Sequence, residues 1–210
     1  KQIRGSGGII VQVDDSQFHI DPGPGALVKA AEYGVNLRNN IAVLCSHNHH
    51  LHCNDINAVI DAMSVGGLDV RGVFVGNNAV VNGTEKETPY LTNFHRQCVE
   101  RVISIEAGQK VGINNVEIKA TPTKHTDEQC IGFRILTPSF ILGYTSDTGY
   151  SKDLVEAFKG VDLLILNVKH PIDTKDEFNL CTHDAARIVD EVKPKLVIIT
   201  HYGIKMVESD

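Results

Sequence analysis

Residues 42–55 read AVLCSHNHHLHCND, an apolar run followed by four histidines within six positions. The run has the composition of a buried strand ending at Cys45, and a helical pattern begins near Asn54. Side chains two apart in an extended chain point to the same side, so His47 and His49 direct their imidazoles together. Neutral imidazole is a good ligand for zinc, iron or nickel, and loops after strands often carry sites. The segment therefore predicts metal binding by a group of four histidines: His47, His49, His50 and His52.

The size and composition of the chain are those of one globular domain. Its 210 residues can bury a core without disulfides, and 42% of them are hydrophobic and 22% charged. A formal charge of −6 and the lack of any Lys/Arg run disfavour nucleic acid and anionic membranes as partners. No apolar stretch approaches the ~20 residues of a membrane span, and the N-terminus resembles a Gly-rich turn rather than a signal peptide. We expect a single domain over residues 1–210, a cytoplasmic location and a small-molecule substrate.

Five cysteines are scattered through the sequence without a C-x-x-C pair. An odd number in this arrangement argues against a disulfide framework and against a Cys-rich zinc site. We expect buried or partly buried free thiols in a reducing compartment. Cys53 differs from the others because it follows His52 directly, which would place it near a bound metal.

Nine short apolar or β-branched runs indicate a strand-rich core. The expected strands are Ile9–Val13, Ile41–Cys45, Val73–Val75, Val102–Ile105, Val116–Ala120, Ile131–Leu136, Phe140–Tyr144, Leu163–Asn167 and Leu196–Thr200. They occur first in pairs and then alternate with helices. Because nearly continuous apolar strands need cover on both faces, this order predicts two sheets with helices packed outside them.

Four segments have helical character, each with a recognisable start or stop. They are Gly25–Tyr33, Asn54–Met63, Ser151–Phe158 and Thr182–Val192, and the first residue of each of the last three is the expected N-cap. The polar stretch Gly76–Asn93 predicts a long irregular loop, and loops of that length are usually functional or mobile.

Three further candidate ligands each lie in a loop beside an apolar strand. They are His125 in ATPTKHTDEQ, Asp147 in FILGYTSDTGY and His201 in LVIITHYG. Taken alone, His201 is equally consistent with the end of a capped strand, and an aspartate before Thr-Gly is ordinary turn chemistry. Together the three form a set of His and Asp side chains at strand ends.

The order of these motifs resembles the metallo-β-lactamase superfamily along almost the whole chain. Asp21 in HIDPG, the His-x-His cluster, His125, Asp147 in SDTG and His201 match the five motifs of that family. The segments NDINAVIDAM and VKPKLVIITHYGIKM resemble an uncharacterised archaeal branch of these metal-dependent hydrolases. The resemblance implies an α/β fold, a four-layer αββα sandwich with its metal site at one edge of the two sheets.

The resemblance also implies a set of metal ligands and a cofactor. His47, His49 and His125 would hold a first metal, His52 and His201 a second, and Asp147 would bridge the two. Zinc, as one or two ions, is the expected cofactor, although iron and manganese accept the same ligands. Asp21 would hydrogen-bond into the histidine loop, with turn capping as its alternative role.

Leu51 departs from the family pattern H-x-H-x-D-H, because it occupies the position of the aspartate. In the family that carboxylate binds the second metal and helps to orient the attacking hydroxide, and leucine does neither. A two-metal site depends on ions about 3.5 to 4 Å apart that together hold a hydroxide. The loss of the carboxylate therefore weakens both the binding of the second metal and the activation of the hydroxide. Three outcomes stay open: one tightly bound metal, two metals with water in place of the carboxylate, or a second site that uses His50 or Asp55.

We expect a metal-dependent hydrolase that cleaves a small-molecule ester, lactone or phosphodiester through metal-bound hydroxide. The expected catalytic residues are Asp147, which would hold the metals, and His201, and either the other metal or a histidine would stabilise the oxyanion. Candidate substrate contacts are Asn167, Lys169 and His170 in LILNVKHP, and the alternative is that they are polar residues of the surface without a role. A nucleic-acid-processing nuclease and a non-enzymatic metal- or ligand-binding protein with a decayed site are the competing hypotheses, the second motivated by Leu51.

Overall fold

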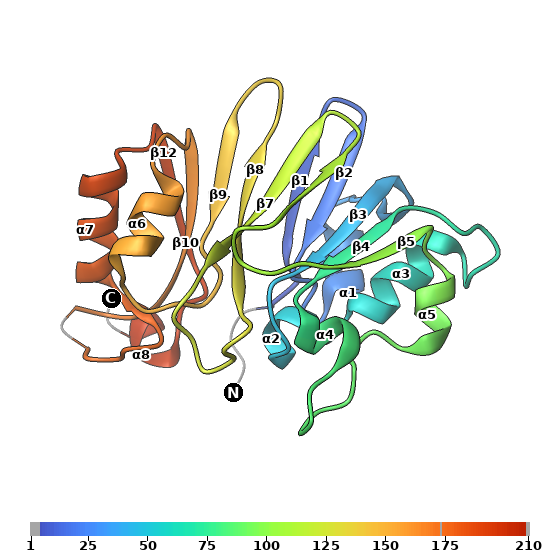
Figure 1. Cartoon of the computed structure of the whole chain (residues 1–210), viewed down its shortest axis with the longest axis horizontal. Coiled ribbons are helices and arrows are strands. Elements are labelled where there is room, and N and C mark those ends of the chain that lie inside the picture. Colours follow the sequence, from blue (N-terminus) through green and yellow to red (C-terminus); the bar gives the residue numbers. More distant parts are fainter. Residues whose placement is uncertain (1–4, 173, 209–210) are drawn as a thin grey trace. The chain divides into compact units, whose positions relative to one another are not determined.

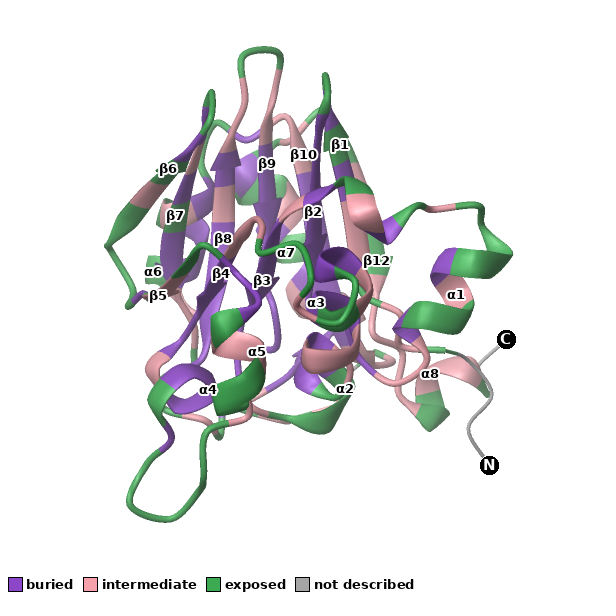
Figure 2. Ribbon diagram, turned by 90° about the vertical axis from the view of Figure 1, so that its right-hand side faces the viewer, coloured by how far each residue is buried: buried purple, intermediate pink, exposed green. Residues whose placement is uncertain are grey.

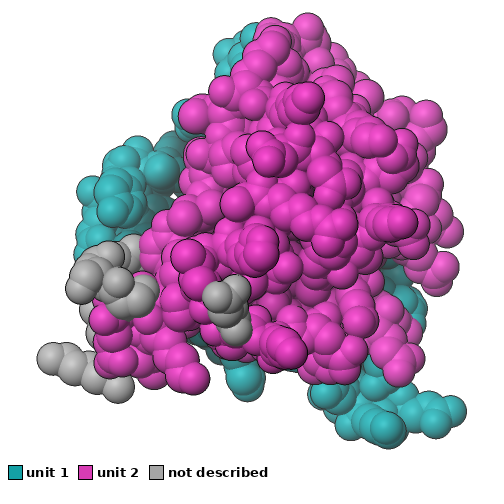
Figure 3. Space-filling view, turned by 90° about the vertical axis from the view of Figure 1, so that its left-hand side faces the viewer, with its two compact units in different colours: residues 1–105 teal, residues 106–210 magenta. Residues whose placement is uncertain are grey.

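Two sheets contain the strands of the described chain, and each belongs to one of two units that join at residue 105 in the sequence (Figure 1, Figure 3). The computed structural model describes residues 5–172 and 174–208. Unit 1 comprises residues 1–105 and unit 2 residues 106–210. In both units the central strands are largely buried, whereas β5, β6 and β12 are mostly exposed or half-buried, and most helices have exposed outer surfaces (Figure 2). The single domain over residues 1–210 stays a prediction.

Unit 1 is built on a five-stranded sheet in the order β1-β2-β3-β4-β5. Its strands are β1 (Ile9–Val13), β2 (Ser16–Ile20), β3 (Asn40–Cys45), β4 (Val73–Gly76) and β5 (Arg101–Ser104). The first two strands form an antiparallel hairpin, and the strands from β2 to β5 run parallel. Their carboxyl ends therefore share one edge of the sheet, the edge at which sites are built in parallel sheets.

The sequence pattern does not predict β2, because SQFHI mixes polar and apolar residues although all five are buried. The polar side chains find partners inside the unit. Gln17 Nε2 donates to Asn40 Oδ1 at 2.6 Å, and His19 Nε2 lies 2.8 Å from the carbonyl oxygen of Gly7. Burial lowers the pKa of His19 and favours the neutral ring. A strand of this composition becomes recognisable only when its hydrogen-bond partners are known.

Five helices and one 3-10 turn accompany the sheet in the described part of unit 1. They are α1 (Ala26–Glu32), η1 (Leu37–Asn39), α2 (His50–Cys53), α3 (Ile56–Ser64), α4 (Asn78–Asn82) and α5 (Asn93–Gln97). The buried side chains of α3 recur at helical spacing and join a hydrophobic cluster with Val43 of β3 and Phe74 of β4. The sequence predicts α1 almost to the residue.

The predicted helix Asn54–Met63 is wrong at its start, because Asp55 separates α2 from α3. The backbone of Asp55 leaves the helical region, with φ −102° and ψ 12°, and its amide donates to the Pro22 carbonyl at 2.9 Å. Its carboxylate accepts the backbone N–H groups of Gly25 and Ala26, both at 2.9 Å. The last two histidines of the segment therefore lie in a helical turn of their own.

The irregular loop predicted for Gly76–Asn93 is wrong in its first part, which contains α4. The side chain of Asn77 caps this helix by accepting the backbone N–H of Val80 at 3.0 Å, and residues 79–81 are buried. Consecutive asparagines are typical of turns, but here the first of them starts a helix. Residues 83–92 have no regular secondary structure, as predicted.

Unit 2 is built on a seven-stranded sheet in the order β11-β10-β9-β8-β7-β6, with β12 paired to β10. Its strands are β6 (Lys110–Ile113), β7 (Val116–Pro122), β8 (Ile131–Leu136), β9 (Ile141–Tyr144), β10 (Leu163–His170), β11 (Leu180–Cys181) and β12 (Leu196–Thr200). Pairing is antiparallel from β6 to β9, whereas β10 is parallel to β9, β11 and β12. Consequently β7, β9, β10 and β12 end at the same edge. The sequence misses β6 and β11, which are short and lack an apolar run.

Three helices belong to the described part of unit 2: α6 (Lys152–Phe158), α7 (Thr182–Val192) and α8 (Ile204–Val207). Helices α6 and α7 lie side by side and bury their apolar faces with strand β10 in one hydrophobic cluster (Figure 1). Across residues 5–172 and 174–208, no helix combines the length and the hydropathy that a bilayer span requires.

The caps of α6 and α7 confirm one prediction and correct another. Ser151 accepts the backbone N–H of Leu154 at 3.0 Å and is the N-cap of α6, as predicted. The predicted cap of α7, Thr182, is wrong because Cys181 occupies that position. The carboxylate of Asp184 accepts the Cys181 backbone N–H at 3.1 Å and so satisfies the start of the helix.

Candidate functional site

Asp21, at the end of β2, holds the histidine segment that follows the neighbouring strand β3. Its Oδ1 accepts the Ser46 backbone N–H at 2.7 Å, and its Oδ2 accepts the Ser46 hydroxyl at 2.6 Å. His52 Nδ1 lies 2.8 Å from the same Oδ2. A carboxylate only accepts hydrogen bonds, so His52 donates from Nδ1 and keeps the lone pair for a metal on Nε2. The predicted hydrogen bonds from Asp21 into the histidine loop are confirmed.

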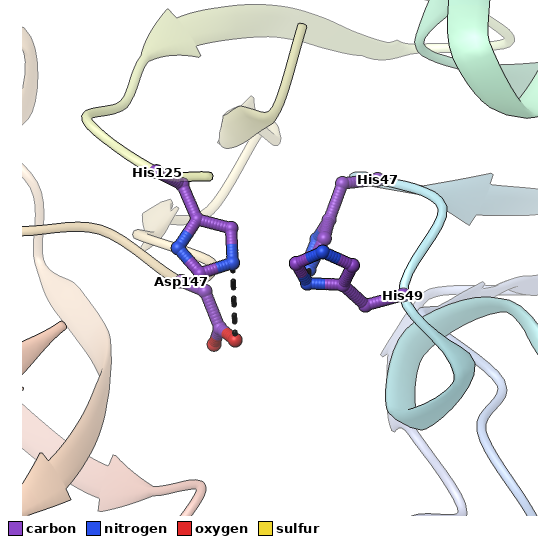
Figure 4. Close-up of side chains that lie close together, drawn as sticks. All are labelled: His47, His49, His125 and Asp147. Atoms are coloured by element: carbon purple, nitrogen blue, oxygen red, sulfur yellow. Dashed lines mark hydrogen bonds and ion pairs between the residues drawn. The ribbon is translucent and has the colours of Figure 1, made fainter. Parts of the chain in front are cut away.

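His47 and His49 turn their rings toward one another, as the His-x-His spacing predicts (Figure 4). His47 Nε2 lies 3.1 Å from His49 Nδ1, and the ring centroids are 4.6 Å apart. The Ser46 hydroxyl lies 2.9 Å from the other ring nitrogen of His47, which is fully buried. The centroid of the His52 ring is 4.2 Å from that of His47. Unit 1 thus collects three imidazoles, an arrangement that favours one shared cation over several protonated rings.

His50 and Leu51 turn away from this group of rings. His50 Nδ1 lies 2.8 Å from the hydroxyl of Tyr90, which belongs to the irregular segment 83–92. The side chain of Leu51 is 44% exposed, but its carbonyl oxygen is packed so tightly against Gly23 that a Cβ there would approach it to 2.0 Å. The carboxylate of Asp55 is engaged at the start of α1. These contacts favour the two outcomes that leave His50 and Asp55 outside the ligand set.

Cys53 supports the histidine segment with its thiol. It is buried and donates to the carbonyl oxygen of His49 at 3.2 Å. Burial raises the pKa of this thiol to about 12, so it stays protonated at neutral pH, whereas a metal binds the thiolate. The expectation of buried free thiols is confirmed for all five cysteines.

Unit 2 brings its three predicted ligands together at the edge where β7, β9 and β12 end. Asp147 Oδ2 lies 3.8 Å from His125 Nε2 (Figure 4) and 3.2 Å from His201 Nε2. The side chains of Asp147 and His125 are buried, whereas that of His201 is 19% exposed. One carboxylate oxygen thus faces two imidazole nitrogens, the geometry expected of a carboxylate that two metal ions share.

Two hydrogen bonds from neighbouring groups orient Asp147 and His125. Asn167 Nδ2 donates to Asp147 Oδ1 at 2.8 Å, which leaves Oδ2 directed at the two rings. His125 Nδ1 lies 2.9 Å from the carbonyl oxygen of Phe178, an acceptor only, so the lone pair of this ring is on Nε2. Asn167, a candidate substrate contact from the sequence, is buried and donates to Asp147, and its contact with substrate stays a prediction.

The donors in each unit are chemically suited to a divalent transition metal. Unit 1 offers imidazoles, and unit 2 offers two imidazoles around one carboxylate, which are ligands that zinc, iron and manganese accept. Sequence reasoning missed the residues that orient them, Ser46 and Phe178 above all. Ser46 is adjacent to the histidine motif, which is a usable signal, whereas Phe178 contributes a backbone carbonyl that no residue pattern reveals.

A family model described as the beta-lactamase superfamily domain matches residues 16–202. The chain belongs to the metallo-β-lactamase superfamily. The uncharacterised protein MJ1374 of Methanocaldococcus jannaschii is 34% identical over 207 residues, which cover 98% of this chain and 78% of the relative. A Bacillus subtilis relative named "Probable metallo-hydrolase YhfI" is 27% identical over 200 residues, or 92% of this chain and 78% of YhfI. Membership and the resemblance to an archaeal branch are therefore confirmed.

Solved structures confirm the predicted fold class. The crystal structure of the metallo-beta-lactamase fold protein YhfI aligns with a TM-score of 0.79, at 24% identity, over 92% of this chain and 77% of that one. A diphosphatase from the PhnP family aligns with a TM-score of 0.71, at 17% identity, over 92% and 72%. Human tRNase Z, short form, gives 0.72 at 14% identity over 93% and 85%. The chain has the metallo-β-lactamase fold, and its family points to metal-dependent hydrolysis in general.

Proposed function

We propose that this protein is a metal-dependent hydrolase of a small-molecule ester, with phosphodiesters as the favoured class. The observation that carries the proposal is the Asp147 carboxylate, whose Oδ2 faces the Nε2 atoms of His125 and His201 at 3.8 and 3.2 Å. A buried carboxylate oxygen that faces two imidazole nitrogens is a donor arrangement that a divalent transition metal accepts.

The proposed ligand set is the one that the resemblance to the family implies. We assign the first metal to His47, His49 and His125, the second to His52 and His201, and the bridging position to Asp147. Zinc is the proposed ion, with iron and manganese as alternatives that the same ligands accept. Support comes from family membership and from the arrangement of the donors inside each unit.

A bound metal supplies Lewis-acid polarisation of the substrate and activation of water. The chain's own residues hold and orient the ligands for that chemistry. Asp21 keeps the Nδ1 proton of His52 in place, and Asn167 keeps Asp147 Oδ2 directed at its two rings. His201 is the most exposed of the three ligands in unit 2, so we assign it the position nearest the substrate, where it can stabilise developing negative charge.

The substrate class rests on two observations. The diphosphatase and tRNase Z share this fold and, by their names, act on phosphorus esters or anhydrides. The net charge of −6 and the lack of a basic run disfavour a large polyanion, which points to a small molecule. The nuclease hypothesis keeps the tRNase Z likeness in its favour, and salt-dependent binding of RNA would be its signature.

Metal content and hydrolysis together test the proposal. Protein purified without chelator should contain at least one transition metal per chain by plasma mass spectrometry. It should also cleave a phosphodiester such as bis(p-nitrophenyl) phosphate in preference to lactones or thioesters. Wild-type protein that holds no metal would contradict the proposed site, and metal-loaded protein without activity on the whole panel would favour a decayed site.

Leu51→Asp is the matched variant for the missing carboxylate, and the exposure of Leu51 makes the substitution tolerable for folding. If the wild type holds one metal, we expect the variant to hold a second one and to hydrolyse faster. An active wild type with two metals, unchanged in the variant, would show that this chain does not need the carboxylate.

A further inference from the structure

The carbonyl oxygen that orients His125 comes from a segment outside every predicted motif. Phe178 belongs to residues 174–179, which precede β11, and its oxygen lies 2.9 Å from His125 Nδ1. The outer hydrogen bond of a histidine ligand sets its tautomer and its ring orientation. The position of this segment therefore matters to a metal on His125.

Asp176 fixes the segment through three hydrogen bonds. Its Oδ1 accepts the backbone N–H of Phe178 at 2.9 Å. Its Oδ2 lies 2.8 Å from His170 Nε2, at the end of β10, and accepts Asn179 Nδ2 at 2.9 Å. The two side chains are largely buried, with 17% exposure for His170 and 26% for Asp176. His170 thus binds the segment to the end of β10 through Asp176. Asp176 also holds the backbone N–H of Phe178, whose carbonyl oxygen faces His125.

The same segment packs against the other two loops that meet at this edge of unit 2. A Cβ added to Gly149, two residues after Asp147, would lie 1.9 Å from the carbonyl oxygen of Glu177. The Gly149 backbone N–H donates to the Lys124 carbonyl at 2.8 Å. The exposed side chains of Lys124 and Glu177 also pair, with Nζ 3.0 Å from Oε2, but a surface ion pair contributes little to holding the segment. The loops that carry His125 and Asp147 are therefore joined to each other and to the segment.

We propose that His170 and Asp176 are positioning residues for the metal ligand His125, acting through the Phe178 carbonyl. The inference deepens the proposed function and rests on it for its metal readout. His170 was a candidate substrate contact from the sequence, and its bond to Asp176 gives it this role instead. Removal of the Asp176 carboxylate frees the segment, so the Nδ1 proton of His125 loses its fixed acceptor.

Asp176→Ala should weaken metal binding at the site by about tenfold or more, the usual range for outer hydrogen-bond partners of metal ligands. Affinity is measured for zinc by competition with a chromophoric chelator. Glu177→Gln is the matched control within the segment, because Glu177 is exposed and its salt bridge to Lys124 is at the surface. Asp162→Ala controls for loss of stability elsewhere in unit 2, because Asp162 accepts the Ile141 N–H and pairs with Lys195. Both controls should bind zinc like the wild type.

A second readout works on metal-free protein. Nitrogen-15 NMR of the histidine side chains should show His125 as the Nδ1–H tautomer in the wild type and a tautomer mixture in Asp176→Ala. His170→Gln, whose amide nitrogen reaches a similar position, should retain most of the wild-type affinity, and His170→Ala should not. If Asp176 has only a structural role, Asp176→Ala and Asp162→Ala should both lower the thermal midpoint of unfolding. Neither the zinc affinity nor the His125 tautomer should then distinguish the two variants.

The outcomes separate the two proposals. Wild-type protein that binds no metal but loses the Nδ1–H tautomer in Asp176→Ala would overturn the proposed metal site and leave the positioning role standing. Wild-type protein that binds zinc, with affinity and tautomer both unchanged in Asp176→Ala, would overturn the positioning role alone.

Discussion

The histidines of unit 1 and the ligands of unit 2 reach their places by different means. Those of unit 1 lie within six consecutive positions and are organised by one buried carboxylate, Asp21, which takes three hydrogen bonds from Ser46 and His52. Those of unit 2 follow three strands that are far apart in sequence, and a neutral amide and a backbone carbonyl orient them. Local sequence organises the first group, whereas the strand order of a sheet organises the second.

Substitution of the shared carboxylate in unit 2 should have the largest effect. Asp147→Asn keeps the shape and the Asn167 contact but removes the negative charge that faces His125 and His201. We expect metal affinity and hydrolysis to fall by more than about a hundredfold, beyond the range for outer hydrogen-bond partners. The measurements are metal stoichiometry after dialysis and the initial rate on a phosphodiester.

The control for Asp147→Asn is Asp153→Asn, an exposed residue in the first turn of α6 that should change neither quantity. An Asp147→Asn protein that keeps full metal content would remove the bridging role from the proposal.

Loss of the unit 1 anchor should have the next largest effect. Asp21→Ala leaves the Ser46 N–H, the Ser46 hydroxyl and His52 Nδ1 without their buried acceptor. We expect the free energy of unfolding to fall by about 3 kcal/mol and metal affinity to fall about tenfold to a hundredfold. Urea denaturation of the metal-free protein and chelator competition measure the two effects separately.

Asp55→Ala is the matched control for Asp21→Ala, because its carboxylate also accepts three hydrogen bonds within unit 1, none of them from a histidine of the described residues. It should lower the free energy of unfolding and leave metal affinity near that of the wild type. Equal losses of affinity in the two variants would show that stability alone controls metal binding.

The unit 2 anchor should matter less, because Asn167 contributes one neutral hydrogen bond to Asp147. Asn167→Ala should reduce metal affinity by about tenfold, the lower end of the range for such partners. Tyr144→Phe is the control, since it removes the hydroxyl that also lies near the Asn167 amide, at 3.2 Å, and leaves the bond to Asp147. If Asn167→Ala weakens metal binding as much as Asp21→Ala, the proposed contrast between a charged and a neutral anchor fails.

The contrast between the units also explains what the sequence could and could not predict. His47, His49 and His52 are recognisable because a strand end and a two-residue period place their rings together without tertiary information. His125, Asp147 and His201 are single residues in separate loops, and only the resemblance to a family relates them. The role of Asn167 escaped prediction because its partner is twenty positions away, in the loop that follows the neighbouring strand β9.

The fold shows the same limit. Apolar strands such as Ile131–Leu136 were predicted to the residue, whereas the polar strand β2 was missed because its stability depends on partners such as Asn40. The interruption at Asp55 was missed for a similar reason, since the carboxylate binds the start of α1 thirty residues earlier. Patterns within a segment are readable from sequence, and bonds between segments are not.

The smallest effect is expected at His50, and it tests which histidines of unit 1 bind metal. His50 lies among the ligands in sequence, but its Nδ1 faces the Tyr90 hydroxyl at 2.8 Å and its ring is exposed. His50→Ala should therefore keep the metal stoichiometry, with affinity within about twofold of the wild type, because an exposed hydrogen bond contributes little. His49→Ala, one position away, should lose most of the metal, since its ring nitrogen lies 3.1 Å from His47 Nε2. Comparable losses of metal in the two variants would favour the rewired site that uses His50. A loss at His49 alone would show that contacts, rather than proximity in sequence, decide which histidines of this segment bind metal.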